Sequence, residues 1–265
     1  EHQFGDLRRK DMVTDSAPRI RPMAEDGQEE LRTNWMTPFF ISRYDPRTLY
    51  YGANILFKSW DRGDSWTAIS PDLTSQPPTQ GNIPFGTLTT LSESSLQQGL
   101  IYAGADDGFI HVTRDDGGSW TRIDDEIPDL WVSRVEASSH NLGTVYLSLT
   151  GYREDDFSTY LYASDDFGES WRSIASNLPG EPVNVVREDP VDPDILYIGT
   201  DLGVFVSLDR GASWHSLSAT LPTTPVHDLV IHPRDGEIIL GTHGRSVWVA
   251  DLDAVREQAG GKEPL

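Results

Sequence analysis

The chain has no cysteine and only three lysines, and both shortages narrow its chemistry. Without cysteine there are no disulfides, no thiolate metal ligands and no cysteine nucleophile. Arginine supplies 18 of the 21 basic residues, against 42 acidic residues, so the formal net charge is −21. A charge of that sign repels phosphate backbones and anionic membrane surfaces, and we therefore expect no nucleic-acid partner.

Long apolar runs are also missing. No run approaches the roughly 20 residues that span a bilayer, so we expect no membrane insertion. The chain starts at Glu1 without the apolar region of a signal peptide, which favours an internal piece of a longer protein over a processed product. Its 265 residues, 37% of them hydrophobic, are enough for a packed core in one large all-β domain or two smaller ones.

One pattern is present four times, Ser/Thr-x-Asp-x-Gly-x-Ser-Trp, which we call the octapeptide. The copies SWDRGDSW, TRDDGGSW, SDDFGESW and SLDRGASW begin at residues 59, 113, 164 and 207, which are 54, 51 and 43 residues apart. A repeat of that length is typical of propeller blades. Short runs rich in β-branched and aromatic residues surround each copy and predict four strands per repeat, A to D, with the octapeptide between C and D.

We therefore predict an all-β fold, a β-propeller of four-stranded antiparallel blades, with about five blades in this chain. An N-terminal segment at 1–34 and a tail at 254–265 flank the propeller, whose blades are expected at about 35–74, 83–126, 131–177, 182–220 and 225–253. The fifth blade has neither the octapeptide nor a strand D. Two weak strand candidates, Asp6–Met12 and Pro18–Met23, either complete it and close a ring or are strands C and D of an earlier blade in a larger propeller.

The octapeptide predicts structure rather than chemistry. Its Asp can accept hydrogen bonds from backbone N–H groups of its own turn, its Gly can adopt a left-handed conformation, and its Trp can pack between neighbouring sheets. The residues in these roles are Asp61, Gly63, Trp66, Asp115, Gly117, Trp120, Asp166, Gly168, Trp171, Asp209, Gly211 and Trp214. The adjacent acidic pairs leave a calcium site open, but the pattern lacks the many oxygen ligands calcium needs. We expect no metal and no cofactor.

The octapeptide resembles the Asp-box, or BNR repeat, of sialidases, sortilin-type receptors and related propellers. Residues 32–74 and the stretch GTHGRSVWVADLD at 241–253 resemble the C-terminal propeller part of bacterial sortilin-like, YVTN/BNR-like repeat proteins. The resemblance spans about residues 32–253. It implies a secreted or periplasmic, cell-envelope propeller of a kind often labelled a glycosyl hydrolase from its repeats alone. The cysteine-rich module of animal sortilins is absent.

A sialidase site is not evident in the sequence. The resemblance would imply three convergent arginines, a Tyr–Glu nucleophile pair and an acidic proton donor, and the chain does not display that set. The segment most similar to the sialidase Arg-Ile-Pro signature is Arg19-Ile20-Arg21-Pro22, which differs from it by an inserted arginine. A glycosidase using two carboxylates roughly 5–10 Å apart stays open, because acidic residues are too abundant for the sequence to pair them.

Candidate binding residues follow from the blade geometry. If the octapeptides mark the C–D turns at one end of the blades, the B–C turns and D–A connections lie at the other end, and we call that end the binding face. Its candidate residues are Asn54, Asp106, Asp107, Trp131, Tyr152, Arg153, Asp201, His243 and Arg245. We predict a non-catalytic propeller that binds a protein or carbohydrate ligand there, with the rest of a larger propeller or another subunit as a further partner. The alternative is a sialidase- or xyloglucanase-like glycoside hydrolase. Alternatively, each of these residues is an ordinary polar turn residue with no role in binding.

Overall fold

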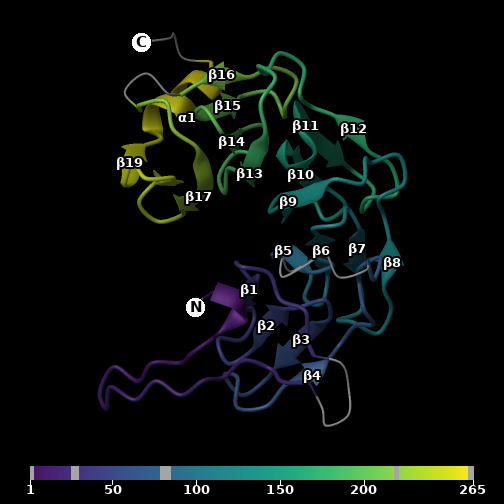
Figure 1. Cartoon of the computed structure of the whole chain (residues 1–265). Coiled ribbons are helices and arrows are strands. Elements are labelled where there is room, and N and C mark those ends of the chain that lie inside the picture. The colour runs from purple at the N-terminus through teal and green to yellow at the C-terminus, as the bar shows by residue number, and fades with distance from the viewer. Residues whose placement is uncertain (1–2, 25–29, 78–84, 218–220, 262–265) are drawn as a thin grey trace. The chain divides into compact units, whose positions relative to one another are not determined.

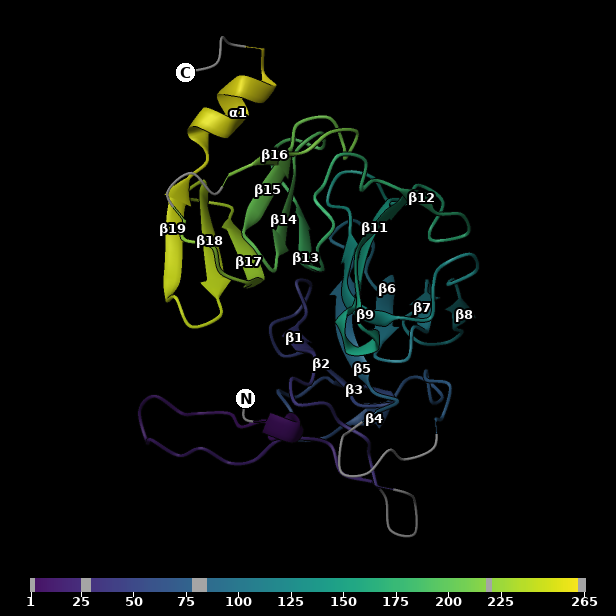
Figure 2. The same cartoon turned by 45° about the horizontal axis from the view of Figure 1, so that its top comes forward.

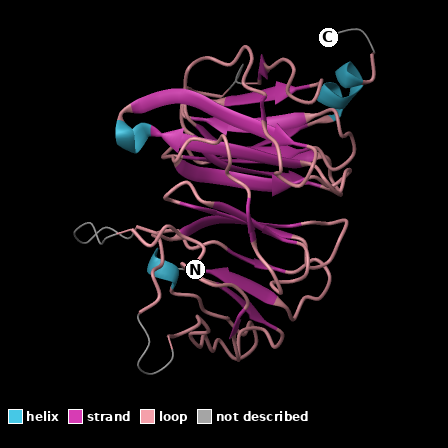
Figure 3. Cartoon of the chain, turned by 90° about the vertical axis from the view of Figure 1, so that its right-hand side faces the viewer, coloured by secondary structure: helices cyan, strands magenta, loops and turns pink. Residues whose placement is uncertain are grey.

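Short antiparallel strands joined by loops form most of the regular structure of the protein (Figure 3). The computed structural model describes residues 3–24, 30–77, 85–217 and 221–261. Within these ranges the helical segments are η1 (Gln3–Gly5), η2 (Tyr152–Glu154) and α1 (Asp253–Ala259). None of the helices in the described ranges has the length and apolar character to cross a membrane.

The strands pair with their sequence neighbours into five sheets, and most of the strands are labelled in Figure 1. The chain divides into two compact units, Glu1–Val132 and Ser133–Leu265. The two sheets of the first unit are β1 (Phe39–Ile41), β2 (Leu49–Gly52), β3 (Leu56–Ser59) and β4 (Thr67–Ala68), then β5 (Leu88–Glu93), β6 (Ile101–Ala105), β7 (Ile110–Thr113) and β8 (Thr121–Arg122). Because each sheet uses four consecutive antiparallel strands, these are blades with strands A to D in order.

The second unit continues the same pattern from β9, which crosses the division between the units. Its sheets are β9 (Trp131–Ala137), β10 (Val145–Gly151), β11 (Asp156–Ser164) and β12 (Arg172–Ser173), then β13 (Val183–Glu188), β14 (Leu196–Thr200), β15 (Val204–Ser207) and β16 (His215–Ser216), then β17 (Val226–His232), β18 (Glu237–Thr242) and β19 (Val247–Asp251). The last sheet has three strands in the described residues. The predicted all-β propeller fold of about five blades is confirmed.

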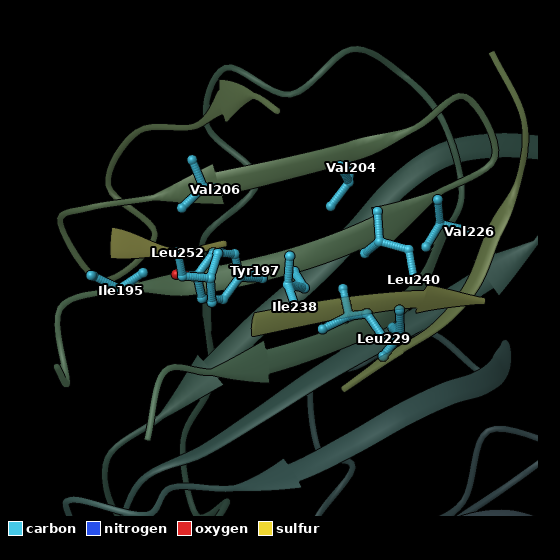
Figure 4. Packing of buried hydrophobic residues seen from close by; sticks show 10 residues of the cluster. Ile195, Tyr197, Val204, Val206, Val226, Leu229, Ile238, Leu240 and Leu252 are labelled. Carbon is cyan, nitrogen blue, oxygen red and sulfur yellow. The ribbon is translucent and has the colours of Figure 1, made fainter. Parts of the chain in front are cut away.

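Each unit has its core between adjacent sheets, because both faces of a middle strand are covered. Every residue of β2, β6, β10 and β14 is buried. In the second unit Tyr197 of β14 packs beside Ile238 of β18 and Leu252 (Figure 4). A strand buried on both faces reads as a continuous apolar run, which is why the alternating pattern is weak in this sequence.

In the first octapeptide turn, backbone and hydroxyl donors surround the Asp61 carboxylate. Ser65 N–H donates to Asp61 Oδ1 at 2.9 Å, and the preceding Ser59 hydroxyl donates to the same oxygen at 2.8 Å. The Ser65 hydroxyl donates to Asp61 Oδ2 at 2.6 Å. Together these bonds lower the pKa of Asp61 to about 2, and the bond from the Ser65 hydroxyl contributes most. Arg62 and Gly63 both have positive φ, 67° and 89°, as a tight turn between twisted strands requires.

The octapeptide tryptophans tie each sheet to the segment before it. The indole Nε1 donates to a backbone carbonyl one blade earlier, from Trp120 to Ile69 at 2.8 Å and from Trp214 to Ile174 at 2.7 Å. Trp66 makes the same bond, at 2.6 Å, to Ile20 of the N-terminal segment. Three of the four octapeptide tryptophans thus join their blade to the preceding segment of the chain.

The N-terminal segment is a narrow hairpin on the first unit (Figure 2) rather than two full strands. Its pairing is one antiparallel bridge, Arg8 with Arg19, and the Ile20 N–H donates to the Leu7 carbonyl at 2.8 Å. Leu7 and Ile20 pack on Tyr51 of β2. Residues 1–2 and 25–29 of the expected 1–34 segment lie outside the described residues. So do 78–84, the last two of which begin the expected second blade, and 218–220 at the end of the fourth.

The C-terminal residues differ from the expected tail, because Asp253–Ala259 form α1. Leu252, just before it, is 1% exposed and belongs to the core. The Arg256 guanidinium pairs at 3.1 Å with the carboxylate of Asp189, which is wholly buried. A buried charge needs such a partner, so α1 is held in place by an ion pair as well as by apolar contact. Residues 262–265 lie outside the described residues.

Candidate functional site

The B–C turns of the first unit carry three predicted binding residues, Asn54, Asp106 and Asp107, and the first two are buried. Asn54 is 7% and Asp106 3% exposed. The Asp106 carboxylate accepts the Gly86 N–H at 2.8 Å, the Thr87 N–H at 2.9 Å and the Thr87 hydroxyl at 2.6 Å. Burial raises the pKa of Asp106, although these hydrogen bonds oppose the shift. Asp106 therefore positions the residues that lead into β5.

Asn54 and Asp107 also bind their own chain. Asn54 donates to Asp72 at 3.0 Å, and Asp72 pairs with the Arg32 guanidinium at 2.6 Å. Asp107 accepts the Ser75 N–H at 2.7 Å and the Ser75 hydroxyl at 2.8 Å. These groups hold the D–A connections against the B–C turns. Residues 78–84 of the connection between the first two blades lie outside the described residues.

Two exposed apolar residues, Trp35 and Met36, lie next to these hydrogen-bonded turns. Trp35 is 52% and Met36 75% exposed. They follow Asn34, which is 6% exposed and donates to Asp106 at 3.2 Å and to Thr87 at 2.8 Å. The binding face of the first unit thus presents apolar side chains held by a buried hydrogen-bond network, and sequence reasoning did not single out this pair.

In the second unit residues 151–159 extend the β10–β11 hairpin, with η2 at its tip. Tyr152 is 45% and Phe157 56% exposed. The Arg153 guanidinium carbon lies 4.5 Å from the centre of the Tyr152 ring. The predicted residues Tyr152 and Arg153 therefore contact each other, and Phe157 lies in the same hairpin.

Hydrogen bonds link this hairpin to the next blade. The Thr159 hydroxyl donates to the Glu181 carbonyl at 2.8 Å and accepts the Glu181 N–H at 3.0 Å. The Glu181 carboxylate in turn accepts the Leu202 N–H at 2.8 Å. Glu181 is 4% exposed, and this burial raises its pKa, whereas the Leu202 side chain is 55% exposed. The link fixes an apolar side chain at the surface.

The contacts continue along the same end of the second unit. Asp201 accepts a hydrogen bond from Asn184 at 3.0 Å, and the rings of His227 and His243 lie 5.2 Å apart. Desolvation and the neighbouring His243 lower the pKa of His227, while Asp201 opposes the shift. The His243 N–H donates to the Pro225 carbonyl at 2.9 Å. We call the set Tyr152, Phe157, Thr159, Glu181, Asp201, Leu202, His227 and His243 the second-unit rim.

Two predicted residues make less distinctive contacts. Trp131 is half-buried at the start of β9, and Arg245 accepts the Trp248 indole N–H at its backbone carbonyl, at 2.8 Å. Glu181 and Leu202 were missed by sequence reasoning. The available signals were a charged residue between Gly180 and Pro182 in a D–A connection and an apolar residue in a turn otherwise made of polar residues.

A charged network runs across the A strands of the second unit. Arg134 pairs with Asp228 at 2.9 Å, and Arg187 pairs with Glu136 at 2.6 Å and with Asp228 at 3.3 Å. Burial, together with the nearby Arg187 charge, lowers the pKa of Arg134 to about 10, so the guanidinium remains charged at neutral pH. Two cations face two anions, and the network is balanced. Over the described part of the chain, no group of three or more His, Asp or Glu side chains is placed to hold a metal ion.

Comparison with known proteins shows the fold. No protein-family model and no curated protein matches the chain. Among solved structures, the chain is similar to a GH74 xyloglucanase from Xanthomonas campestris, with 20% identity over 80% of this chain and 36% of that one, and a TM-score of 0.61. It is also similar to YCF48 bound to D1 peptide, with 14% identity over 83% of this chain and 66% of that one, and a TM-score of 0.52.

A third similar structure is the extracellular domain of a protein assigned to the one-component systems of B. thetaiotaomicron. The identity is 15%, the coverage is 90% of this chain and 28% of that one, and the TM-score is 0.57. At these identities the likeness concerns the propeller fold alone. This chain spans about a third of the length of the xyloglucanase and two thirds of that of YCF48.

Proposed function

We propose that this chain is a non-catalytic propeller that binds a protein ligand through the second-unit rim, on the B–C and D–A face. One observation carries the proposal: the carboxylates there accept hydrogen bonds from their own chain, while the apolar side chains are exposed. Glu181 is 4% exposed, whereas Tyr152, Phe157 and Leu202 are 45%, 56% and 55% exposed. A cluster of exposed aromatic and aliphatic groups with a polar surround is typical of a protein-binding surface.

The geometry supports a pre-formed surface. The Thr159–Glu181 and Glu181–Leu202 hydrogen bonds hold residues from three segments at fixed positions, so a ligand need not order them. The negative net charge of −21 favours a ligand with basic groups around its apolar contact. Support by analogy comes from the similar structure of YCF48, which is bound to D1 peptide.

Two finer expectations belong to the same proposal. The octapeptide turns support membership of the Asp-box, sortilin-like class of bacterial repeat proteins. The extracellular neighbour from B. thetaiotaomicron supports a secreted or cell-envelope location. A glycan ligand or glycoside hydrolysis remains an outcome of the test below.

The experiment uses the intact chain on a protein array and a glycan array, followed by titration of the strongest ligand. Leu202→Asp places a charge at the centre of the rim. The matched control is Val191→Asp, since Val191 is also an exposed aliphatic residue, 64% exposed, in the A–B turn of the same blade and therefore at the other end. We expect a protein ligand, with affinity lowered at least roughly tenfold by Leu202→Asp and unchanged by Val191→Asp.

The same samples are incubated with xyloglucan, and reducing ends are measured. Hydrolysis of xyloglucan that co-purifies with the chain contradicts the non-catalytic proposal. Binding that is lost in Val191→Asp but kept in Leu202→Asp moves the site to the other end of the blades. A ligand found on the glycan array alone replaces the protein partner by a sugar.

A further inference from the structure

The last sheet of the second unit has an exposed strand whose counterparts in the other sheets are buried. Val247 of β19 pairs with Gly241 of β18, as Val204 of β15 pairs with Gly199 of β14. Two residues on, Val249 pairs with Ile239 as Val206 pairs with Tyr197. The registers match, so Val247 and Val249 occupy the two strand-C positions held by Val204 and Val206.

The exposures at these positions differ sharply between blades. At the first position Leu56, Ile110, Leu161 and Val204 are at most 2% exposed, whereas Val247 is 63% exposed. At the second position Lys58, Val112, Ala163 and Val206 are at most 4% exposed, whereas Val249 is 56% exposed. The sequence at β19 is as apolar as in the other C strands, but the side chains lie in solvent.

The burial elsewhere comes from the blade that follows in sequence. Val204 and Val206 pack on Val226, Leu229 and Ile238 of the next sheet. Strand D lies along the edge in the same blades, where the Leu217 N–H donates to the Val204 carbonyl at 2.9 Å. In the described residues of the second unit, 133–217 and 221–261, no strand pairs with the second edge of β19. An apolar strand with an open edge is a site for strand addition.

We propose that β19 binds a strand D carrying the octapeptide, from polypeptide outside residues 1–265, and that the blade following this strand covers Val247 and Val249. The other sheets specify its contacts. The backbone N–H of the residue equivalent to Leu217 donates to the Val247 carbonyl, as Leu217 donates to Val204. The tryptophan of the added strand donates to the Leu217 carbonyl, which corresponds to the Ile69 and Ile174 carbonyls in the earlier blades. The pattern Ser-x-Asp-x-Gly-x-Ser-Trp, with Ile or Leu three residues after the Trp, identifies the partner strand.

The N-terminal hairpin is already engaged in its own unit. Its Ile20 N–H bonds the Leu7 carbonyl, and its Ile20 carbonyl accepts the Trp66 indole, which are the contacts of a C–D strand pair placed before the first blade. Pairing it with β19, in the same chain or a second copy, would break these bonds. Two copies joined in one ring would also hold about ten or more blades, above the typical four to eight. These points favour an outside strand over a second copy.

The test supplies the missing strand by tether. Residues 207–217, the octapeptide and strand D of the fourth blade, are fused after Leu265 through a flexible linker of about 15 residues, which keeps the added strand at a high local concentration. Hydrogen exchange of 246–252 is compared with that of the untethered chain. We expect exchange there to slow roughly tenfold or more, and a Trp214→Ala change in the added copy to remove most of the protection.

A second variant addresses the edge itself. By the register above, the Val249 N–H points to the free edge, so Val249→Pro removes the donor without touching the β18 ladder. The untethered Val249→Pro chain should melt within a few degrees of the parent, and the tethered one should show no added protection. Unchanged exchange with the tether overturns the proposal. Protection of β19 in the untethered monomer, or in a concentration-dependent dimer, also overturns it, because residues 1–265 then cover the edge themselves.

Discussion

Replacing Trp214 tests whether the octapeptide is structural. Its side chain is 3% exposed and packs on Ile174, and its indole donates to the Ile174 carbonyl at 2.7 Å. Trp214→Ala removes a buried aromatic side chain, which costs about 3–5 kcal/mol. Trp214→Phe keeps a ring but leaves the Ile174 carbonyl unpaired, which costs about 1–3 kcal/mol. At roughly 2–4 °C per kcal/mol for a chain of this size, the expected losses are about 6–20 °C and 2–12 °C.

The assay is thermal unfolding followed by circular dichroism and calorimetry, with ligand binding measured on the folded variants at low temperature. The control is Trp60→Ala, since Trp60 lies in the first octapeptide but is 51% exposed. Its ring contacts the Lys58 ammonium at 5.2 Å, so its loss should change stability by about 1 kcal/mol or less. A Trp214→Ala chain that melts with the parent but no longer binds its ligand would refute the structural role and make the octapeptide part of the binding surface.

Further predictions concern backbone and pH. Gly63→Ala should lower the melting temperature by several degrees, because φ is +89° and a Cβ would lie 2.8 Å from Ile20 Cδ1, whereas Gly180→Ala, with no atom within 4 Å, should not. Since the folded pKa of Asp61 is about 2, below its ordinary 3.8, its stabilisation is full above about pH 4 and is lost as pH falls towards 2, so Asp61→Asn should flatten the acid limb of a melting-temperature profile. Burial raises the pKa of Glu181 above its ordinary 4.5, so ionisation of this carboxyl group destabilises the folded state as the pH rises above 4.5. Glu181→Gln should therefore raise the melting temperature at pH 7 but not at pH 4.

The fold was predictable because the octapeptide repeats at blade spacing. Asp61 and Gly63 have a side-chain acceptor and a permissive backbone at fixed offsets, and these local demands are visible in any copy. The hydroxyl at the first position was not anticipated. Ser59 receives the Gly63 N–H at 2.8 Å as well as bonding Asp61, which explains why Ser or Thr begins all four copies.

The binding face was only partly predictable. Asp106 and Asn54 look like exposed turn residues in the sequence, but their roles depend on partners at Thr87 and Asp72, which no local pattern predicts. Leu202 shows the opposite case. Its apolar side chain suggests a buried residue in the sequence, but it is 55% exposed in the structure. The extent of the second-unit rim therefore follows from tertiary contacts between three D–A and B–C segments.

The hydrogen-exchange footprint of the bound protein ligand on the intact chain tests the central claim most directly. Binding at the second-unit rim predicts slower exchange in 152–159 and 200–203, and no change in the octapeptide turns at 164–171 and 207–214, which lie at the other end of the same blades. Protection confined to the octapeptide turns, with unchanged exchange at the rim, would contradict it.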